Sequence, residues 1–294
     1  MVSAAHTVLG AVPATRLGVV DAHDHLFIRS PRLPGQELDD AEAAAARLAA
    51  FASLGGGTVV QWTPYGMGRR IARLPALSRE SGVHVIAATG LHQHVHYSDA
   101  LLASVRDRLD ELFVGELTEG IGDTGVRAGL IKVAGGFHGL DEHAVHTMRA
   151  AATAHHATGA PIAVHLELGT GVLDVLDLVC GELGVAPGSL ILGHLNRTPD
   201  FTVHRLAAEA GTWLAFDGPS RANHATDWRM PDALRALVDA GFAGRLLLGG
   251  DTVTPDTPGM PYLLRRVRPR LELDLGQEVL EQILVANPAR AYAW

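Results

Sequence analysis

Short apolar runs alternate with longer amphipathic segments along the chain, and the alternation repeats eight times. The apolar runs cover residues 18–25, 57–63, 83–90, 128–135, 161–167, 189–195, 212–218 and 245–251. Between them, apolar residues recur at three- and four-residue spacing, as in 39–55 and 140–159, and both of these segments end at a glycine. Strand followed by helix, repeated eight times, predicts a parallel sheet closed into a (β/α)8 TIM barrel, an α/β fold. A doubly wound open sheet is the alternative.

The length of the chain fits one such barrel. The chain has 294 residues, and a (β/α)8 barrel typically needs about 250. No linker, low-complexity tract or change of composition divides the sequence. We therefore expect a single domain over residues 1–294.

Charge, cysteine content and the N-terminal residues narrow the class of protein. The net charge is −8 and no tract is strongly basic, which argues against a nucleic-acid partner. The single cysteine, Cys180, excludes an internal disulfide framework and is typical of the cytoplasm. Residues 1–10 lack the features of a secretory signal, and no run approaches the about 18 apolar residues of a membrane span. We expect a cytoplasmic protein that has no membrane partner.

The first apolar run ends in an unusual polar sequence, VVDAHDH, at residues 19–25. His23 and His25 are two residues apart, so a strand places both imidazoles on one face. Two buried imidazoles side by side are costly without a partner. Either a metal ion binds them or they form a hydrogen-bonded pair in the core. Asp24 would point to the opposite face, where a salt bridge or a backbone cap is a better expectation than catalysis.

Four later strands carry further residues that bind or adjoin metals. They are Lys132, His165, His194 and Asp251. Catalytic groups of a (β/α)8 barrel lie at the carboxyl ends of its strands, so these side chains and the two histidines of the first strand should converge on one rim. Neutral imidazoles and a carboxylate are good ligands for zinc and its divalent neighbours.

Lys132 differs from the other candidates because its ammonium group cannot bind a cation. Burial beside metal ions favours the neutral amine, which can add carbon dioxide and become an anionic, bidentate carbamate. Such a group could bridge two metals together with a hydroxide. An ordinary buried ion pair between Lys132 and a carboxylate is the alternative.

Six motifs occur in the order found in one enzyme family. They are VDAHDH (20–25), GVRAGLIKVAG (125–135), IAVHLE (162–167), LILGHLNR (190–197), LLLGGD (246–251) and ILVANPARAY (283–292). With the further similarity of 78–91 and 115–134, the chain resembles, from about residue 7 to 293, the phosphotriesterase family of the amidohydrolase superfamily. The phosphotriesterase-like lactonases belong to that family.

The resemblance implies a barrel with two divalent metals, Zn²⁺ or alternatively Mn²⁺, Co²⁺ or Fe²⁺. By that match, His23, His25 and Asp251 hold the more buried metal. His165 and His194 hold the more exposed metal, and carbamylated Lys132 bridges both. The resemblance also implies a homodimer.

The implied reaction is the attack of a bridging hydroxide on an ester-like carbonyl or phosphoryl centre. The exposed metal would polarise the oxygen that accumulates charge. Asp251 would take the proton of the hydroxide and deliver it towards the leaving group.

Several loop residues are candidates for contact with the substrate. In several relatives an aspartate lies three residues after the histidine of the sixth strand, but here that position holds Arg197, which would attract an anion or pair with a carboxylate. Arg221 is a loose match to an arginine of lactone-opening relatives. In the loop after the third strand, His92 could contact substrate and Tyr97 could donate to its leaving group, with His94 and His96 alternating beside them. The loop after the eighth strand could act as a lid, and Tyr262 in it could line the apolar wall of the site.

Three functions remain open from the sequence. A two-metal hydrolase acting on a lactone is the main prediction, and a mouth rich in histidine and arginine favours a polar or anionic substrate such as a sugar lactone. A phosphotriester or phosphoester hydrolase would use the same metal centre. A non-catalytic binding protein on a degenerate barrel is the remote alternative.

Overall fold

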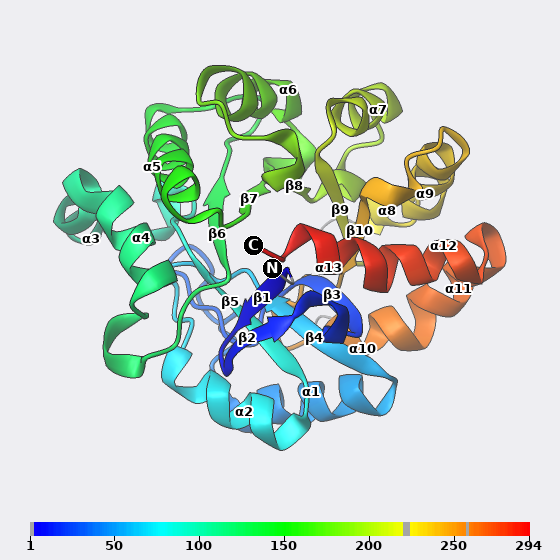
Figure 1. Cartoon of the computed structure of the whole chain (residues 1–294), viewed down its shortest axis with the longest axis horizontal. Coiled ribbons are helices and arrows are strands. Elements are labelled where there is room, and N and C mark those ends of the chain that lie inside the picture. Colours follow the sequence, from blue (N-terminus) through cyan, green and yellow to red (C-terminus); the bar gives the residue numbers. More distant parts are fainter. Residues whose placement is uncertain (1–2, 220–223, 257–258) are drawn as a thin grey trace.

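Eight parallel strands form a ring with helices around it, as Figure 1 shows in a view down the shortest axis of the molecule. The computed structural model describes residues 3–219, 224–256 and 259–294. The strands of the ring are β3 (Val19–Asp24), β4 (Gly56–Gln61), β5 (His84–Thr89), β6 (Leu130–Ala134), β7 (Ile162–His165), β8 (Leu190–Gly193), β9 (Trp213–Asp217) and β10 (Leu246–Gly249). Seven lie inside a predicted run and β4 starts one residue before its run, so the (β/α)8 barrel is confirmed and the open sheet is excluded.

Helices connect consecutive strands and cover the outside of the ring. They are α1 (Ala41–Ser53), α2 (Leu74–Ser81), α3 (Asp99–Val105), α4 (Leu109–Thr118), α5 (Glu142–Thr158), α6 (Val172–Val175), α7 (Phe201–Ala210), α8 (His224–Asp227), α9 (Met230–Asp239), α10 (Gly259–Tyr262), α11 (Arg268–Leu275), α12 (Gln277–Glu281) and α13 (Asn287–Ala291). Stretches of π-helix at Leu176–Glu182, Leu263–Val267 and Gln282–Ala286 extend α6, α10 and α12.

Capping side chains and a glycine mark the ends of the predicted helices. Asp40 caps α1 by accepting from the amides of Glu42 and Ala43, and Asp141 caps α5 by accepting from Ala144. Gly159 ends α5 at a φ of +86°, a conformation that glycine adopts without steric cost. In the described part of the chain, no helix is both long and apolar enough to cross a membrane.

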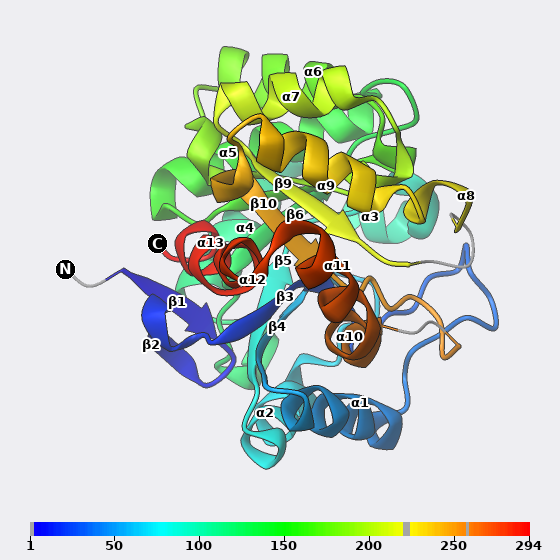
Figure 2. The same ribbon diagram turned by 90° about the vertical axis from the view of Figure 1, so that its right-hand side faces the viewer.

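A short N-terminal hairpin, β1 (Ala4–Thr7) and β2 (Gly10–Pro13), is an element that the strand-and-helix pattern does not predict. The amide of Trp294 donates to the carbonyl of Ala4, and the indole of Trp294 stacks on His6. Figure 2 shows this hairpin and the C-terminus at one end of the barrel, with the loops after β3 and β10 at the other end. The hairpin therefore closes the end of the barrel opposite the strand tips.

The core has two layers, one inside the ring and one between the ring and the helices. The inner layer is filled by buried apolar side chains from every strand, among them Val20, Trp62, Ile86, Leu130, Ala163, Ile191, Ala215 and Leu247. The indole of Trp62 donates to the carbonyl of Ala22 at 2.9 Å. This packed floor separates the N-terminal end of the barrel from the polar residues at the strand tips.

The ring has one seam. Strands pair in chain order from β3 to β10, and the described residues form no ladder between β10 and β3. A backbone bond from the amide of Asp251 to the carbonyl of His23, 2.9 Å long, crosses this seam. Predicted metal ligands lie at or directly beyond the carboxyl ends of both strands.

Candidate metal centre

The six predicted ligands lie at the carboxyl ends of their strands. His23 lies in β3 and His25 directly after it, Lys132 lies in β6, His165 ends β7, His194 follows β8 and Asp251 lies two residues after β10. All except His165 are buried, and His165 is nearly so. Residues separated by up to 228 positions in the sequence thus form one polar cluster.

Three ligand atoms gather at the β3–β10 seam. Oδ1 of Asp251 lies 3.6 Å from Nε2 of His23 and 3.7 Å from Nε2 of His25. These three residues form one of the two side-chain groups in the described chain that are close enough to hold a metal ion. Burial lowers the pKa of His25 well below its ordinary value, which favours the neutral imidazole that metals require.

Asp217, the last residue of β9, was not among the predicted site residues, yet it links two of them. Nδ1 of His23 donates to Asp217 at 3.0 Å, and Nδ1 of His194 donates to it at 2.7 Å. Burial acts to raise the pKa of Asp217, but the imidazoles of His194 and His23 hold it well below its ordinary value. Its position at the tip of an apolar run, the same signal that marked Asp251, could have identified it from the sequence.

Thr63 plays the equivalent part for His25. The hydroxyl of Thr63 donates to the carbonyl of Phe27 at 2.6 Å, so it accepts from Nδ1 of His25 at 2.7 Å. The proton of each of His23, His25 and His194 therefore lies on Nδ1, and Nε2 carries the lone pair. Fixing the outer N–H in this way is how proteins orient metal-binding histidines.

His165 is oriented in the opposite sense. Its Nε2 donates to Glu167 at 3.1 Å, which leaves Nδ1 as the nitrogen with the lone pair. That atom lies 2.7 Å from Nε2 of His194. Burial lowers the pKa of both histidines, which favours the neutral imidazoles that metals require. The two inward nitrogens would both be available to one cation.

Lys132 lies buried near the same cluster. Burial lowers its pKa to about 7, although Asp251 and Glu167 act to raise it. Its charge lowers the pKa of His25 and of His165, so its amine is near both halves of the cluster. The lowered pKa favours the neutral amine, the form that can add carbon dioxide.

Arg197 pairs with Asp251. Its Nη2 donates to Oδ2 of Asp251. The other oxygen of that carboxylate, Oδ1, faces His23 and His25. The Nε of Arg197 is buried and has no hydrogen-bond partner among the described residues. The carboxylate pairing expected as an alternative for Arg197 is therefore present, and part of the guanidinium keeps unused donors.

The remaining substrate-contact candidates have different surroundings. His92 is buried, its ring centroid lies 4.5 Å from that of His165, and its Nδ1 accepts from the amide of Gln93. Tyr97 is also buried, and its hydroxyl accepts from the amide of His92 at 2.7 Å. Tyr262 is exposed in α10. Arg221 lies outside the described residues.

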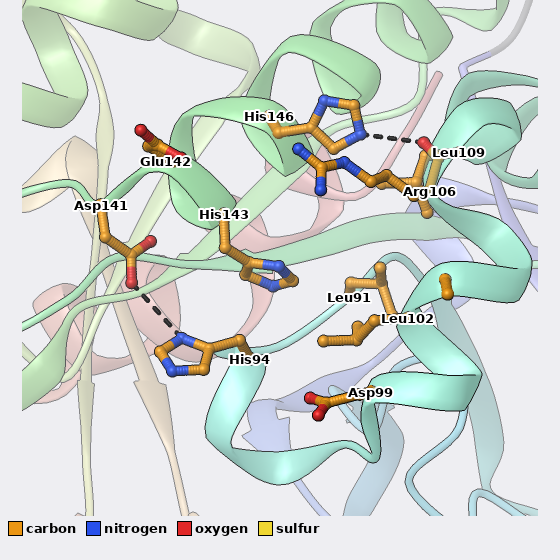
Figure 3. A pocket seen from close by; sticks show the side chains of 11 residues that line it. Leu91, His94, Asp99, Leu102, Arg106, Leu109, Asp141, Glu142, His143 and His146 are labelled. Atoms are coloured by element: carbon orange, nitrogen blue, oxygen red, sulfur yellow. Dashed lines mark hydrogen bonds and ion pairs between the residues drawn. The ribbon is translucent and has the colours of Figure 1, made fainter.

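Of the other two histidines of the loop after β5, His96 stacks on His92 with ring centroids 4.4 Å apart, whereas His94 lines a separate pocket. His96 lies 2.7 Å from the hydroxyl of Ser30. His94 faces Asp141 across a separate pocket of about 600 Å³ between α3 and the start of α5 (Figure 3). His92 thus contacts the predicted ligand His165 and His96 contacts His92, while His94 belongs to the separate pocket.

The mouth of the site also carries exposed apolar side chains. Val95, Phe137, Leu168, Trp228 and Tyr262 are exposed on segments that follow β5, β6, β7, β9 and β10. The sequence-based description of a mouth rich in histidine and arginine is therefore incomplete.

The donor set fits a metal centre. Four imidazoles have their outer N–H bonded to oxygen and their other nitrogen turned inward, and a carboxylate lies among them. A (β/α)8 barrel with such side chains at its strand tips is typical of metal-dependent enzymes.

Comparison with known proteins narrows that class. The family model described as "Phosphotriesterase family" matches residues 3–292. A phospho-furanose lactonase from Mycoplasmopsis synoviae is 30% identical over 324 residues, covering 99% of this chain and 92% of the relative. The lactonase Lmo2620 from Listeria monocytogenes superimposes with a TM-score of 0.90 at 26% identity, covering 99% of both chains. A mutant of organophosphorus hydrolase from Deinococcus radiodurans does so with a TM-score of 0.86 at 29% identity, covering 98% of this chain and 97% of that one.

The chain belongs to the phosphotriesterase family. It is an enzyme, a metal-dependent hydrolase that acts on ester bonds. The alternative of a non-catalytic binding protein is thereby excluded.

Proposed function

We propose that this chain is a lactonase whose substrate is polar or anionic, such as a sugar lactone or its phosphate ester. The observation that carries the proposal is the inward set of lone pairs on four imidazoles, each fixed by an outer hydrogen bond. Support for a lactone comes from whole-length relatives that are named as a phospho-furanose lactonase and a lactonase.

We assign the ligands as the sequence resemblance implies. His23, His25 and Asp251 would hold one divalent cation, and His165 and His194 would hold the second. Lys132, converted to a carbamate, would be shared between them, and its lowered pKa of about 7 supports that conversion. Zn²⁺ is the expected metal because imidazole and carboxylate suit it, with Mn²⁺, Co²⁺ or Fe²⁺ as alternatives.

When bound, the two cations would supply Lewis acidity and acidify a water, which gives a hydroxide nucleophile at neutral pH. The protein would contribute proton transfer and orientation. Asp251 would accept a proton on Oδ2 and pass it to the alkoxide of the opened ring. Arg197 holds that oxygen in this structure, so we propose that an anionic substrate draws the guanidinium away and frees Oδ2.

The substrate contacts follow from the loop geometry. Because Nδ1 of His92 accepts a backbone bond, its proton is on Nε2, which can donate to a substrate oxygen. Tyr97 would act through His92, whose amide it holds. Arg197 would bind an anionic group with its unused donors, and Tyr262 would cover the site from α10. Arg221 remains a candidate from the sequence.

Hydrolysis of phosphotriesters or phosphoesters is the second candidate. The structural similarity to organophosphorus hydrolase supports it, and a phosphoryl centre can use the same cations and nucleophile. A tenfold preference between the two substrate classes amounts to only about 1.4 kcal/mol, so we expect one activity to accompany the other.

A substrate panel tests the proposal. Purified protein loaded with Zn²⁺ is assayed with phosphorylated furanose lactones, their neutral counterparts, long-chain acyl lactones and an activated aryl phosphotriester. We expect the highest kcat/KM with a phosphorylated or neutral sugar lactone. A higher kcat/KM with the phosphotriester would favour the second candidate, and activity on none of the lactones would overturn the first.

We also propose that the enzyme is a cytoplasmic homodimer, as the resemblance and the single Cys180 suggest. Light scattering on the eluted protein gives its mass directly, and a monomer would overturn the dimer.

A further inference from the structure

An extra residue in β3 places two aspartates side by side behind the candidate metal centre. Asp21 pairs with Val59 of β4, whereas Asp24 pairs with Gln61, so three steps along β3 match two along β4. This irregularity is a β-bulge, and it turns Asp21 and Asp24 to the same side of the sheet. Both side chains are 0% exposed. Strict alternation would instead have separated them.

The two carboxylates accept hydrogen bonds from both sides of the barrel seam. Oδ1 of Asp21 accepts from the amide of His23 at 3.2 Å and from that of Gly250 at 3.1 Å. Oδ1 of Asp24 accepts from the amide of His25 at 2.6 Å and from that of Thr252 at 2.9 Å. Each aspartate therefore joins the amide of a candidate ligand on β3 to the segment after β10.

The amide between those two, that of Asp251, donates to the carbonyl of His23 at 2.9 Å. Three consecutive amides, from 250 to 252, are thus held by β3 at the one seam where the described residues form no ladder. Asp251 has a φ of +46°, a left-handed conformation that is unfavourable for a residue with a side chain. The three bonds hold it in that conformation.

The glycines of the LGGD motif allow this approach. A Cβ on Gly249 would lie 2.6 Å from the carbonyl oxygen of His23, and a Cβ on Gly250 would overlap the carboxylate of Asp24. Both positions therefore need glycine so that the two segments can meet.

We propose that Asp21 and Asp24 are positioning residues of the metal centre, a carboxylate clamp that fixes His23, His25 and Asp251 relative to one another across the seam. The inference rests on the proposed metal centre. The clamp bonds to the segments that carry these three candidate ligands. It does not bond to His165, which Glu167 orients, or to His194, which Asp217 orients. It acts on one of the two cation sites.

Cobalt binding by the full-length protein tests the clamp. Metal-free wild-type protein is titrated with Co²⁺ while its visible absorption is followed, and the two binding steps are fitted separately. In Asp24→Ala the acceptor is lost, and we expect one step to weaken about 10- to 100-fold, as for other partners that orient metal ligands, with the other step unchanged. Asp24→Asn keeps an oxygen at the Oδ1 position, so we expect it to restore most of the affinity.

Asp200→Ala is the matched control. Asp200 also accepts from two backbone amides, those of Thr202 and Val203, but these belong to α7 and neither carries a candidate ligand. We expect this variant to lose stability and to keep both Co²⁺ affinities. Equal binding by Asp24→Ala and wild type, or equal weakening of both steps in Asp24→Ala, would overturn the clamp. Failure of the wild type to bind Co²⁺ would instead overturn the proposed centre.

A measurement on wild-type protein covers the case in which Asp24→Ala does not fold. Amide hydrogen exchange is followed in the metal-free chain at residues 250–252. We expect slow exchange at all three amides, because the clamp holds them before any cation arrives. Exchange as fast as in an exposed loop would contradict the proposal. Asp21→Ala, which removes the bonds to His23 and Gly250 only, serves as the second variant in the cobalt titration.

Discussion

Arg197 donates a hydrogen bond to Oδ2 of Asp251, while Oδ1 of the same carboxylate faces the imidazoles of His23 and His25. One carboxylate thus serves a cationic side chain and a candidate cation site through different oxygens. Relatives with an aspartate at the position of Arg197 would instead have two carboxylates here. A cation at this position cannot accept a proton, and under the proposed function it would favour an anionic substrate.

Replacing Arg197 should affect anionic substrates most. A hydrogen bond to a charged group contributes about 1.5–3 kcal/mol. We therefore expect Arg197→Gln to lose about 10- to 100-fold more kcat/KM with a phosphorylated lactone than with its neutral counterpart. Arg205→Gln, which removes an exposed ion pair with Glu209, is the control. An equal loss with both lactones would show that Arg197 acts only on Asp251.

Asp217→Asn should weaken metal binding at both halves of the centre. An amide cannot accept from Nδ1 of both His23 and His194 as the carboxylate does. We expect the affinity for Zn²⁺, measured by competition with a chelating dye, to fall by about 10- to 100-fold. Asp40→Asn, at the N-terminus of α1, is a control that leaves the centre intact. Unchanged Zn²⁺ affinity in Asp217→Asn would show that the histidines hold their orientation without it.

Metal removal should lower both activity and stability. A ligand that binds only the folded state at 100 times its Kd adds about 2.7 kcal/mol to the free energy of unfolding. We expect prolonged chelation to abolish ester hydrolysis and to lower the Tm, and added Zn²⁺, Mn²⁺ or Co²⁺ to restore both. Full activity in protein shown by elemental analysis to lack metal would refute the two-cation centre.

Lys132 should bind carbon dioxide. A carbamate on its amine would give a distinct carbonyl signal when metal-loaded protein is prepared in ¹³C-labelled bicarbonate and observed by ¹³C NMR. We expect that signal in the wild type and not in Lys132→Met, together with loss of metal from the variant. A wild-type spectrum without the signal in fully loaded protein would favour an ordinary ion pair of Lys132 instead.

His204 should make stability fall in acid. His204 lies in α7, and its burial lowers its pKa to about 4. An unfolded histidine has a pKa of about 6.5. Between these values the unfolded chain binds the proton more tightly, so the free energy of unfolding decreases as the pH falls from about 6.5 to 4. In urea titrations His204→Leu should show a shallower decrease over that range. A slope identical to wild type would show that other groups dominate.

The sequence on its own determined the barrel and which residues meet in the candidate centre. Apolar runs of strand length alternate with helical segments, and that local periodicity fixed eight strands close to their observed limits. Because the tips of parallel strands meet at one end of a barrel, His23, His25, Lys132, His165, His194 and Asp251 could be placed together without knowing any contact. The expectation that Asp24 makes a salt bridge or caps the backbone also follows from local alternation, and the structure shows the backbone cap.

Only the tertiary structure decided how those ligands are held. Asp217 contacts His23 across 194 positions of the sequence, and no local pattern encodes that bond. The bulge that brings Asp21 beside Asp24 breaks the alternation on which strand analysis relies. Arg197 could have turned to an anion or to a carboxylate, and its direction depends on where Asp251 lies. Periodicity reports which face of an element is buried, whereas hydrogen-bond partners depend on distances between elements, which are set when the barrel closes.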